Sequence, residues 1–412
     1  MTTSPTRPIS VIDLFAGCGG LTQGFHELRV GGIEQQRFRT VGAVEWDVAA
    51  ASTYAANFAD EAGGVDHIFT GEEGNIEHWE PSLLDGVQVD VILGGPPCQG
   101  FSGLNKQKDD DPRNQLWRHY MRVVHEFSPM VFVMENVEPF RRKPEFQQLQ
   151  EATRPGGELE DYHLEVLVLN AADYGVPQAR KRTIVMATRR DLIGLHPQRI
   201  PLKHPVATHR KPVKNESPAL VKGESLVDMW VPVSTVFERT DYRAPNTELP
   251  ERTCQPLNET LPGIFSTTEL HIGRNPTKHS LARYEAIPPE GNRHNLPEHL
   301  STPSWIRHRT GTADVMGRLR WNDPSVTIRT EFFKPEKGRY LHPFAHRPIT
   351  HYEAALIQGF PPDFKWCGSK VQIARQIGNA VPVGLARAIA GQVYTYLSAT
   401  GQVRQADLGR SA

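Results

Sequence analysis

Short apolar runs separated by helix-length amphipathic stretches dominate the first 190 residues of the chain. Six runs have the length and composition of buried strands: SVIDLF, RTVGAVEW, VDVILGG, MVFVMEN, HLEVLVLN and RTIVMATR. Several are apolar throughout, as expected for parallel strands that are covered on both faces. The pattern predicts an α/β fold with a doubly wound, mostly parallel sheet.

The composition and periodicity of the sequence change after this region. Residues 191–344 are rich in Pro, His and Thr and show little periodicity, which predicts a second, smaller and irregular domain. Helical spacing of Ala, Leu and Ile returns from ITHYEAALIQGF to GLARAIAGQVYTYL. We therefore expect one domain over residues 1–190, completed by 345–412, and a second over 191–344.

Composition narrows the class of protein. Of the 412 residues 38% are hydrophobic, and no apolar run approaches the roughly 20 residues that span a bilayer. The first ten residues have no signal-peptide core, so we expect a cytoplasmic protein without a membrane role. Four cysteines, lying far apart and without a CxxC pair, suggest neither a disulfide framework nor a metal site: Cys18, Cys98, Cys254 and Cys367.

Charge is distributed unevenly along the chain. The net charge is −1, yet residues 1–100 contain fourteen Asp and Glu against four Arg and no Lys. Residues 271–320 contain eight Lys and Arg, four acids and five His, which would suit a phosphate-facing surface. A solvated face explains the same charges, and both interpretations stay open.

A glycine-rich turn, DLFAGCGGL, follows the first predicted strand. Absent side chains would let the backbone approach a nucleotide-like ligand there, although such a turn can also be purely structural. Glu45 ends the next strand-like run, where an acid can accept hydrogen bonds from ribose hydroxyls, and Trp46 beside it could lie against adenine. An exposed acid that merely ends a strand is the alternative.

The segment VDVILGGPPCQGFS presents Cys98 after a strand, two glycines and two prolines. Ligand sites of open α/β sheets lie at such strand ends. A cysteine nucleophile acts as its thiolate, which exposure and nearby positive charge favour. A lone cysteine is more often a small buried hydrophobe, an interpretation that fits the other three cysteines better.

Two further segments bring polar side chains to strand ends. MVFVMENV ends a buried strand with Glu135 and Asn136, an acid and an amide that could also simply terminate the strand. In NAADYGVPQARKR, Arg180 and Arg182 are two residues apart at the start of a strand, so both could serve one ligand. A surface pair is the ordinary alternative.

Together with DPSVTI and QIGNAVP, these motifs resemble in order and spacing the motif set of C5 cytosine DNA methyltransferases, from about residue 10 to 395. The resemblance implies a Rossmann-like catalytic domain that binds S-adenosyl-L-methionine and a small target-recognition domain. It also implies double-stranded DNA as the partner, with a cognate restriction endonuclease as a further possible partner.

The resemblance also implies residue roles in catalysis. Cys98 attacks C6 of cytosine, Glu135 contacts N3 and the exocyclic amine, and Arg180 approaches the O2 carbonyl. Asn136 and Arg182 support this arrangement. Elimination of Cys98 follows methyl transfer to C5 and loss of the C5 proton.

The cofactor contacts implied by the resemblance come from several motifs. Asn75 stands where the family usually has Asp, which leaves cofactor affinity open. The implied set is Phe15, Ala16, Gly17, Gly19, Gly20, Leu21, Glu45, Trp46, Asn75, Ile76, Pro96, Asn379 and Val381.

Because a thiolate cannot reach C6 of a stacked, paired cytosine, the base must leave the helix. We expect the loop QGFSGLNKQK to close on flipped DNA, with Gln99, Ser102, Lys106 and Lys108 as its DNA contacts. Specificity is expected between about residues 191 and 316, and DNA binding would associate the protein with the nucleoid.

Three alternatives remain. An RNA (tRNA) cytosine methyltransferase shares these motifs, but its Cys-Phe-Thr signature is absent here. A catalytically silent DNA-binding paralogue is disfavoured because Cys98, Glu135 and Arg180 are all present. A nucleotide-binding oxidoreductase would leave GGPPCQGFS unexplained.

Overall fold

The computed structural model describes residues 7–30, 36–62, 64–97, 116–212, 227–308 and 310–402. Its internal contacts divide the chain into two units. The first unit consists of Met1–Asn170, Lys181–Val206 and Val383–Ala412, and the second of Ala171–Arg180 and Ala207–Pro382. This division differs from the expected domains mainly near the C-terminus, because residues 345–382 group with the second unit.

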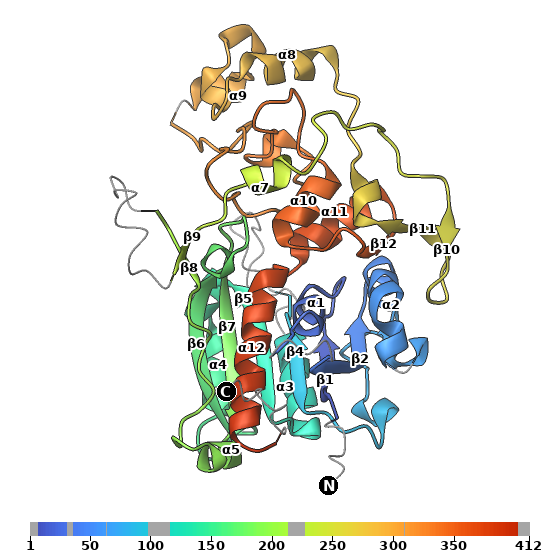
Figure 1. Cartoon of the computed structure of the whole chain (residues 1–412), viewed down its shortest axis with the longest axis vertical. Coiled ribbons are helices and arrows are strands. Elements are labelled where there is room, and N and C mark those ends of the chain that lie inside the picture. The colour runs from blue at the N-terminus through green and yellow to red at the C-terminus, as the bar shows by residue number, and fades with distance from the viewer. Residues whose placement is uncertain are drawn as a thin grey trace, which may run out of the picture. The chain divides into compact units, whose positions relative to one another are not determined.

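A seven-stranded sheet with the order β3-β2-β1-β4-β5-β7-β6 forms the centre of the first unit (Figure 1). Strands β3 to β5 pair in parallel, whereas β7 is antiparallel to both β5 and β6. The expected α/β fold with a mostly parallel sheet is confirmed; the short β3 was not predicted. The strands are β1 Ile9–Leu14, β2 Phe38–Glu45, β3 Ile68–Thr70, β4 Val91–Gly94, β5 Val131–Val137, β6 Tyr162–Asn170 and β7 Lys181–Arg189.

Burial explains why these runs form strands. Every residue of β1 and β4, at the centre of the sheet, is buried. Each fully buried aliphatic side chain contributes about 1.5–3 kcal/mol relative to an exposed one, so continuous apolar runs are stable only where both faces are covered. Their carboxyl ends thus meet at one edge of a rigid sheet.

The helices of the first unit include one from the far end of the chain. Helix α12 packs on α1 so closely that a Cβ at Gly24 would lie 2.4 Å from the Cβ of Ala386. Figure 1 shows α12 running along the sheet beside α1. The helices are α1 Gly20–His26, α2 Val48–Ala62, α3 Leu116–Phe127, α4 Pro144–Ala152, α5 Arg190–Leu195 and α12 Val383–Ala399.

The second unit has short elements joined by long irregular segments, as its Pro-rich sequence predicts. Strands β10, β11 and β12 form an antiparallel sheet, and β8 and β9 form a parallel pair. The strands are β8 His209–Arg210, β9 Asp228–Met229, β10 Thr253–Cys254, β11 Leu261–Ser266 and β12 Lys365–Cys367. The helices are α7 Ser234–Phe237, α8 Lys278–Ala286, α9 Pro303–Arg307, α10 His351–Gln358 and α11 Lys370–Asn379.

A buried arginine organises the part of the second unit around α8. Arg318 is 1% exposed and donates to four backbone carbonyls, including those of Tyr284 at 2.6 Å and Ala345 at 2.6 Å. Burial lowers the pKa of Arg318. Arg293 is also buried and donates to the carbonyl of His308 at 3.1 Å. Of the cations in residues 271–320, Arg293 and Arg318 are therefore buried and do not contribute to a charged surface.

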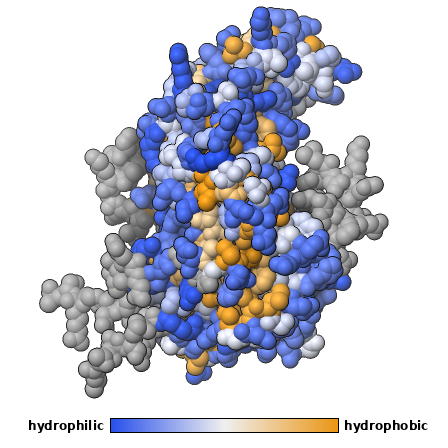
Figure 2. Space-filling view, turned by 90° about the vertical axis from the view of Figure 1, so that its right-hand side faces the viewer, coloured by the Kyte–Doolittle hydropathy of each residue, from blue (hydrophilic) through white to orange (hydrophobic). Residues whose placement is uncertain are grey.

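Exposed hydrophobic residues occur on the surface, among them Trp46, Leu83 and Val371. Figure 2 shows one face, on which hydrophobic residues gather in a band among hydrophilic ones. In the described ranges, every helix is too short or too polar to cross a membrane.

Candidate active site

The turn after β1 has a backbone that few side chains tolerate. Phe15 and Gly17 both have φ of 56°, and Gly19 has φ of 89°. A Cβ at Gly19 would lie 2.3 Å from the Phe58 ring, so this position requires glycine. At Gly17, by contrast, the Cβ position has no atom within 4 Å. The turn is therefore packed on one side and open above Gly17, while Ala16, Gly20 and Leu21 are buried within it.

Glu45, at the end of β2, is bonded to this turn. Its Oε2 accepts from the Gly17 amide at 2.8 Å, and its Oε1 accepts from the Asp47 amide at 2.7 Å. Burial raises the pKa of Glu45, while these two hydrogen bonds oppose the rise. Each carboxylate oxygen has a second lone pair for a ligand hydroxyl. Trp46, the next residue, is 55% exposed.

The segment after β3 lies against the end of β2. A Cβ at Gly74 would be 2.6 Å from the carbonyl oxygen of Glu45, so glycine permits this approach. The side-chain oxygen of Asn75 accepts from the Glu77 amide at 3.1 Å and caps the local turn. Ile76 is buried at 4% exposure. Both predicted cofactor residues are thus held close to Glu45.

Arg122, which the sequence reasoning missed, anchors this segment from α3. Its Nη2 donates to the carbonyls of Ile76 at 3.0 Å and Trp79 at 2.7 Å. Arg122 lies in α3, whose buried residues are Trp117, Tyr120, Met121, Val123 and Val124. Long-range contacts with backbone carbonyls leave no sequence signal.

Asp13 is a second buried carboxyl under the turn. Asp13 is 1% exposed, and its Oδ2 accepts a hydrogen bond from the Thr22 hydroxyl at 2.7 Å. The same Thr22 hydroxyl lies 2.9 Å from the Tyr54 hydroxyl. Burial raises the pKa of Asp13 to about 7, opposed by the Thr22 hydrogen bond, and the charge of Glu45 raises it further.

We expect Asp13→Asn to change the pH dependence of stability. The folded pKa is about 7 against about 3.9 in the unfolded chain, so Asp13 stabilises the fold at low pH and this contribution is lost as pH rises through 7. At 1.36 kcal/mol per pKa unit, the loss amounts to about 4 kcal/mol. Urea unfolding at pH 4.5 and 8 should show the variant gaining on the wild type at pH 8. If the variant and the wild type differ in unfolding free energy by the same amount at both pH values, the raised pKa of Asp13 is refuted. Asp60→Asn, at an exposed position, provides the control.

The end of β4 is shaped by close backbone approaches. A Cβ at Gly94 would lie 2.7 Å from the Leu14 carbonyl oxygen, and one at Gly95 would lie 3.1 Å from Glu135 Oε2. Asn136 is buried and donates from Nδ2 to the Pro96 carbonyl at 3.2 Å. The segment that leads to residue 98 is therefore bound to the end of β5.

Glu135 and Arg182 form an ion pair across β5 and β7. Arg182 Nε lies 2.7 Å from Glu135 Oε1, and their side chains are 13% and 12% exposed. Val137 is the direct partner of Arg182 in the antiparallel register, so Glu135 lies diagonally across the ladder. The pair fixes the Glu135 carboxylate while Oε2 faces Gly95.

Arg180 and Arg182 have different partners within the chain. Arg180 precedes β7, belongs to the second unit and is 2% exposed. Its guanidinium donates to the carbonyls of Ile328 at 2.9 Å and Gly378 at 3.0 Å. Arg182 lies in β7, which begins at Lys181, whereas Arg180 lies just before the strand.

The motifs DPSVTI and QIGNAVP meet in the second unit. Gln178 donates to Gln358 at 2.7 Å and accepts from the Ile328 amide at 2.9 Å. A Cβ at Gly378 would lie 2.4 Å from the Thr330 amide nitrogen. Asn379 is exposed and Val381 is buried. Motifs separated by up to 200 residues thus form one buried network.

Five predicted residues lie outside the described residues: Cys98, Gln99, Ser102, Lys106 and Lys108.

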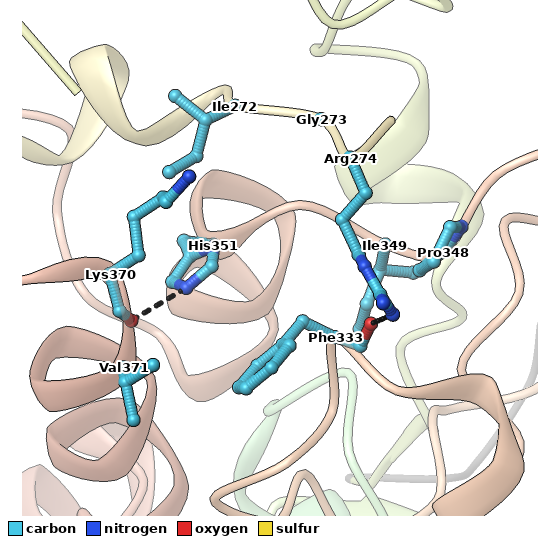
Figure 3. A pocket seen from close by; sticks show the side chains of 9 residues that line it. All are labelled: Ile272, Gly273, Arg274, Phe333, Pro348, Ile349, His351, Lys370 and Val371. Atoms are coloured by element: carbon cyan, nitrogen blue, oxygen red, sulfur yellow. Dashed lines mark hydrogen bonds between the residues drawn. The ribbon is translucent and has the colours of Figure 1, made fainter. Parts of the chain in front are cut away.

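A pocket in the second unit contains none of the predicted site residues. Figure 3 shows His351 bonded to the Lys370 carbonyl at 2.9 Å and Arg274 bonded to the Phe333 carbonyl at 2.7 Å. Burial lowers the pKa of His351 to about 4. The ring is therefore uncharged near neutral pH. Across the ranges that the structure describes, His, Cys, Asp and Glu side chains form no cluster of three or more suited to a metal ion.

Fold and site together define a doubly wound α/β protein with polar groups at the carboxyl ends of its strands, where such folds bind ligands. A sequence profile described as C-5 cytosine-specific DNA methylase matches residues 9–395. The chain therefore belongs to the C-5 cytosine-specific DNA methylase family, and the resemblance noted from its motifs is confirmed. By this membership it is a DNA cytosine-5-methyltransferase, and its relatives are of the restriction–modification type.

Individual relatives match over nearly the whole chain. Type II methyltransferase M.XorII of Xanthomonas oryzae pv. oryzae is 33% identical over 411 residues, covering 94% of this chain and 85% of that protein. Type II methyltransferase M.PspPI of Psychrobacter sp. is 31% identical over 403 residues, covering 97% and 82%. The fold is shared with a prophage-encoded DNA modification methyltransferase from E. coli, with a TM-score of 0.63 and 23% identity over 95% of this chain and 99% of that one.

Proposed function

We propose that this chain transfers a methyl group from S-adenosyl-L-methionine to C5 of a flipped cytosine in a specific duplex DNA sequence. The observation that carries the proposal is that the motif residues gather at one edge of the sheet. The glycine turn follows β1, Glu45 ends β2, Gly95 and Pro96 follow β4, and Glu135 lies near the end of β5.

The residues at the ends of β1 and β2 fit the cofactor. Open space above Gly17 admits a ligand against the backbone, and Glu45 keeps a free lone pair on each oxygen for the two ribose hydroxyls. The exposed Trp46 offers an aromatic face to adenine. S-adenosyl-L-methionine, when bound, supplies an electrophilic methyl group. The assignments of Asn379 and Val381 rest on the resemblance alone.

Cys98 supplies the nucleophile in this proposal. Its thiolate forms a bond to C6, which makes C5 electron-rich, and Glu135 stabilises the altered ring through N3 and the exocyclic amine. After C5 is methylated, loss of the C5 proton and elimination of Cys98 restore the aromatic ring. The Arg182 contact and the Asn136 bond to Pro96 support this role because they position Glu135 and the segment leading to Cys98.

The same chemistry defines the substrate. The cytosine must be flipped out of the duplex, and the loop from Gln99 through Ser102, Lys106 and Lys108 is proposed to contact DNA around it. Target specificity is assigned to residues 191–316. We place the enzyme in the cytoplasm at the nucleoid, where a restriction endonuclease that cuts the same sequence would be its partner.

Methyl transfer to duplex DNA and to tRNA, measured side by side with methyl-labelled S-adenosyl-L-methionine, tests the proposal. We expect label in 5-methylcytosine of DNA only. Label that is found only in tRNA would contradict it. Bisulfite sequencing of DNA from expressing cells would then read the target sequence from the methylated contexts.

Substitution of Arg122 tests the cofactor segment. Arg122→Lys removes the planar donor that holds the Ile76 and Trp79 carbonyls, so we expect the cofactor Kd to rise about tenfold, whereas kcat at saturating cofactor changes little. Isothermal titration with S-adenosyl-L-methionine measures the first, and steady-state kinetics measures the second. The matched control is Arg118→Lys, which lies on the same helix and contacts Gln148 instead. An unchanged Kd would remove Arg122 from the cofactor site.

A further inference from the structure

Two cysteines that are 113 residues apart in the chain meet in the second unit. The Sγ atoms of Cys254 and Cys367 are 3.6 Å apart. Cys254 ends β10 and Cys367 ends β12, and the two strands lie on either side of β11. Figure 1 shows these three strands side by side.

Gly263 of the central strand makes this approach possible. It is the register partner of Cys367, and a Cβ at Gly263 would lie 3.0 Å from Cys254 Sγ. Its φ of 137° also favours glycine. A larger residue would occupy the space through which the two sulfurs face each other.

The two thiols differ in access. Cys254 is partly exposed, whereas Cys367 is fully buried at 0%. A small oxidant can therefore reach Cys254 first, and the Cys367 sulfur, 3.6 Å away, is placed to react with the product. Cys18, in the first unit, is 2% exposed, and burial raises the pKa of its thiol, which keeps it unreactive.

We propose that Cys254 and Cys367 form a reversible intramolecular disulfide when the protein meets an oxidant of the peroxide class. The peroxide oxidises the Cys254 sulfur to a sulfenic acid and one water leaves. The Cys367 thiol then attacks that sulfur, the S–S bond forms, and a second water leaves. Two thiols thus lose two electrons and two protons, and one peroxide is reduced to two waters.

The sheet allows the remaining movement. A disulfide bond is about 2.05 Å long, so the sulfurs must approach by about 1.5 Å. Strand β10 contains two residues and is paired to β11 through Thr253 and Cys254, which makes it the element that shifts. The bond would attach β10, in the region proposed for target recognition, to the strand that precedes the Ser369 cap of α11. Because the Cys254 sulfur is partly exposed, a thiol reductant can attack the bond from that side and reduce it again.

The experiment treats the reduced full-length protein with hydrogen peroxide at low protein concentration, followed by thiol alkylation and peptide mass spectrometry. We expect a peptide pair joining Cys254 to Cys367, lighter by two hydrogens than the two reduced peptides together. Dithiothreitol should restore both thiols.

The variants Cys254→Ser and Cys367→Ser should each abolish this cross-link. Because Cys254 is partly exposed, Cys254→Ser decides the result even where Cys367→Ser does not fold. Cys254 oxidised to a sulfinic acid beside an unmodified Cys367 would overturn the proposal. Linkage of Cys254 to any other cysteine, or to a second copy of the chain, would overturn it as well.

Discussion

Replacing Cys98 by serine is expected to reduce methyl transfer by at least about 10³-fold while leaving duplex DNA binding largely intact. A serine hydroxyl is a much weaker nucleophile than a thiolate at neutral pH, and the substitution changes the size of the side chain little. Initial rates with labelled cofactor measure the first effect, and a mobility shift on the same duplex measures the second.

Cys254→Ser is the matched control, because it makes the same chemical change at a partly exposed cysteine outside the proposed catalytic residues. Under reducing conditions it should keep the methyl-transfer activity that Cys98→Ser loses. Methylation that survives in Cys98→Ser would refute the covalent role of Cys98.

Glu135→Gln is expected to lower kcat by about 10² to 10⁴-fold, the usual range for a positioned acid–base group. The amide keeps the shape of the side chain, but it cannot accept or transfer a proton, and it loses the ion pair with Arg182 at 2.7 Å. Single-turnover methylation at saturating DNA and cofactor isolates this effect from binding.

Glu165→Gln provides the control for Glu135, since Glu165 lies in the same sheet and is also paired, with Lys203 and His163. It should leave kcat unchanged. A Glu135→Gln enzyme with wild-type single-turnover rates would remove the carboxyl group from the reaction.

The sheet was predictable because burial on both faces leaves a local signal. The runs that became β1, β4 and β5 are mostly apolar, and most of their residues are buried. The three-residue strand β3 was missed because so short a run has no period of its own. The short elements of the second unit could not be predicted either, because their conformation depends on contacts between residues far apart in the sequence, such as those of Arg318.

The candidate site was predictable only in part. Glu45 and Glu135 could be singled out because each lies at the end of an apolar run, where parallel strands converge. The residues that contact the predicted site residues could not be predicted from the sequence. The Glu135 contact with Arg182 depends on an antiparallel register, and the Arg122 contact with Ile76 depends on helix packing across the chain.

The cysteines illustrate the same limit. Sequence spacing suggested no relation among the four, and Cys254 was expected to be a small buried hydrophobe. The structure brings it to 3.6 Å from Cys367 and leaves it partly exposed, because a glycine on the strand between them provides the space.

Trapping of the covalent intermediate tests the central claim most directly. A duplex carries 5-fluorocytosine at the methylated position found by bisulfite sequencing, and is incubated with the enzyme and S-adenosyl-L-methionine. Fluorine at C5 cannot leave as a proton does, so elimination of the nucleophile is blocked. We predict a denaturation-resistant protein–DNA adduct whose peptide map places the DNA on Cys98. No adduct, or an adduct on another residue, would contradict the account.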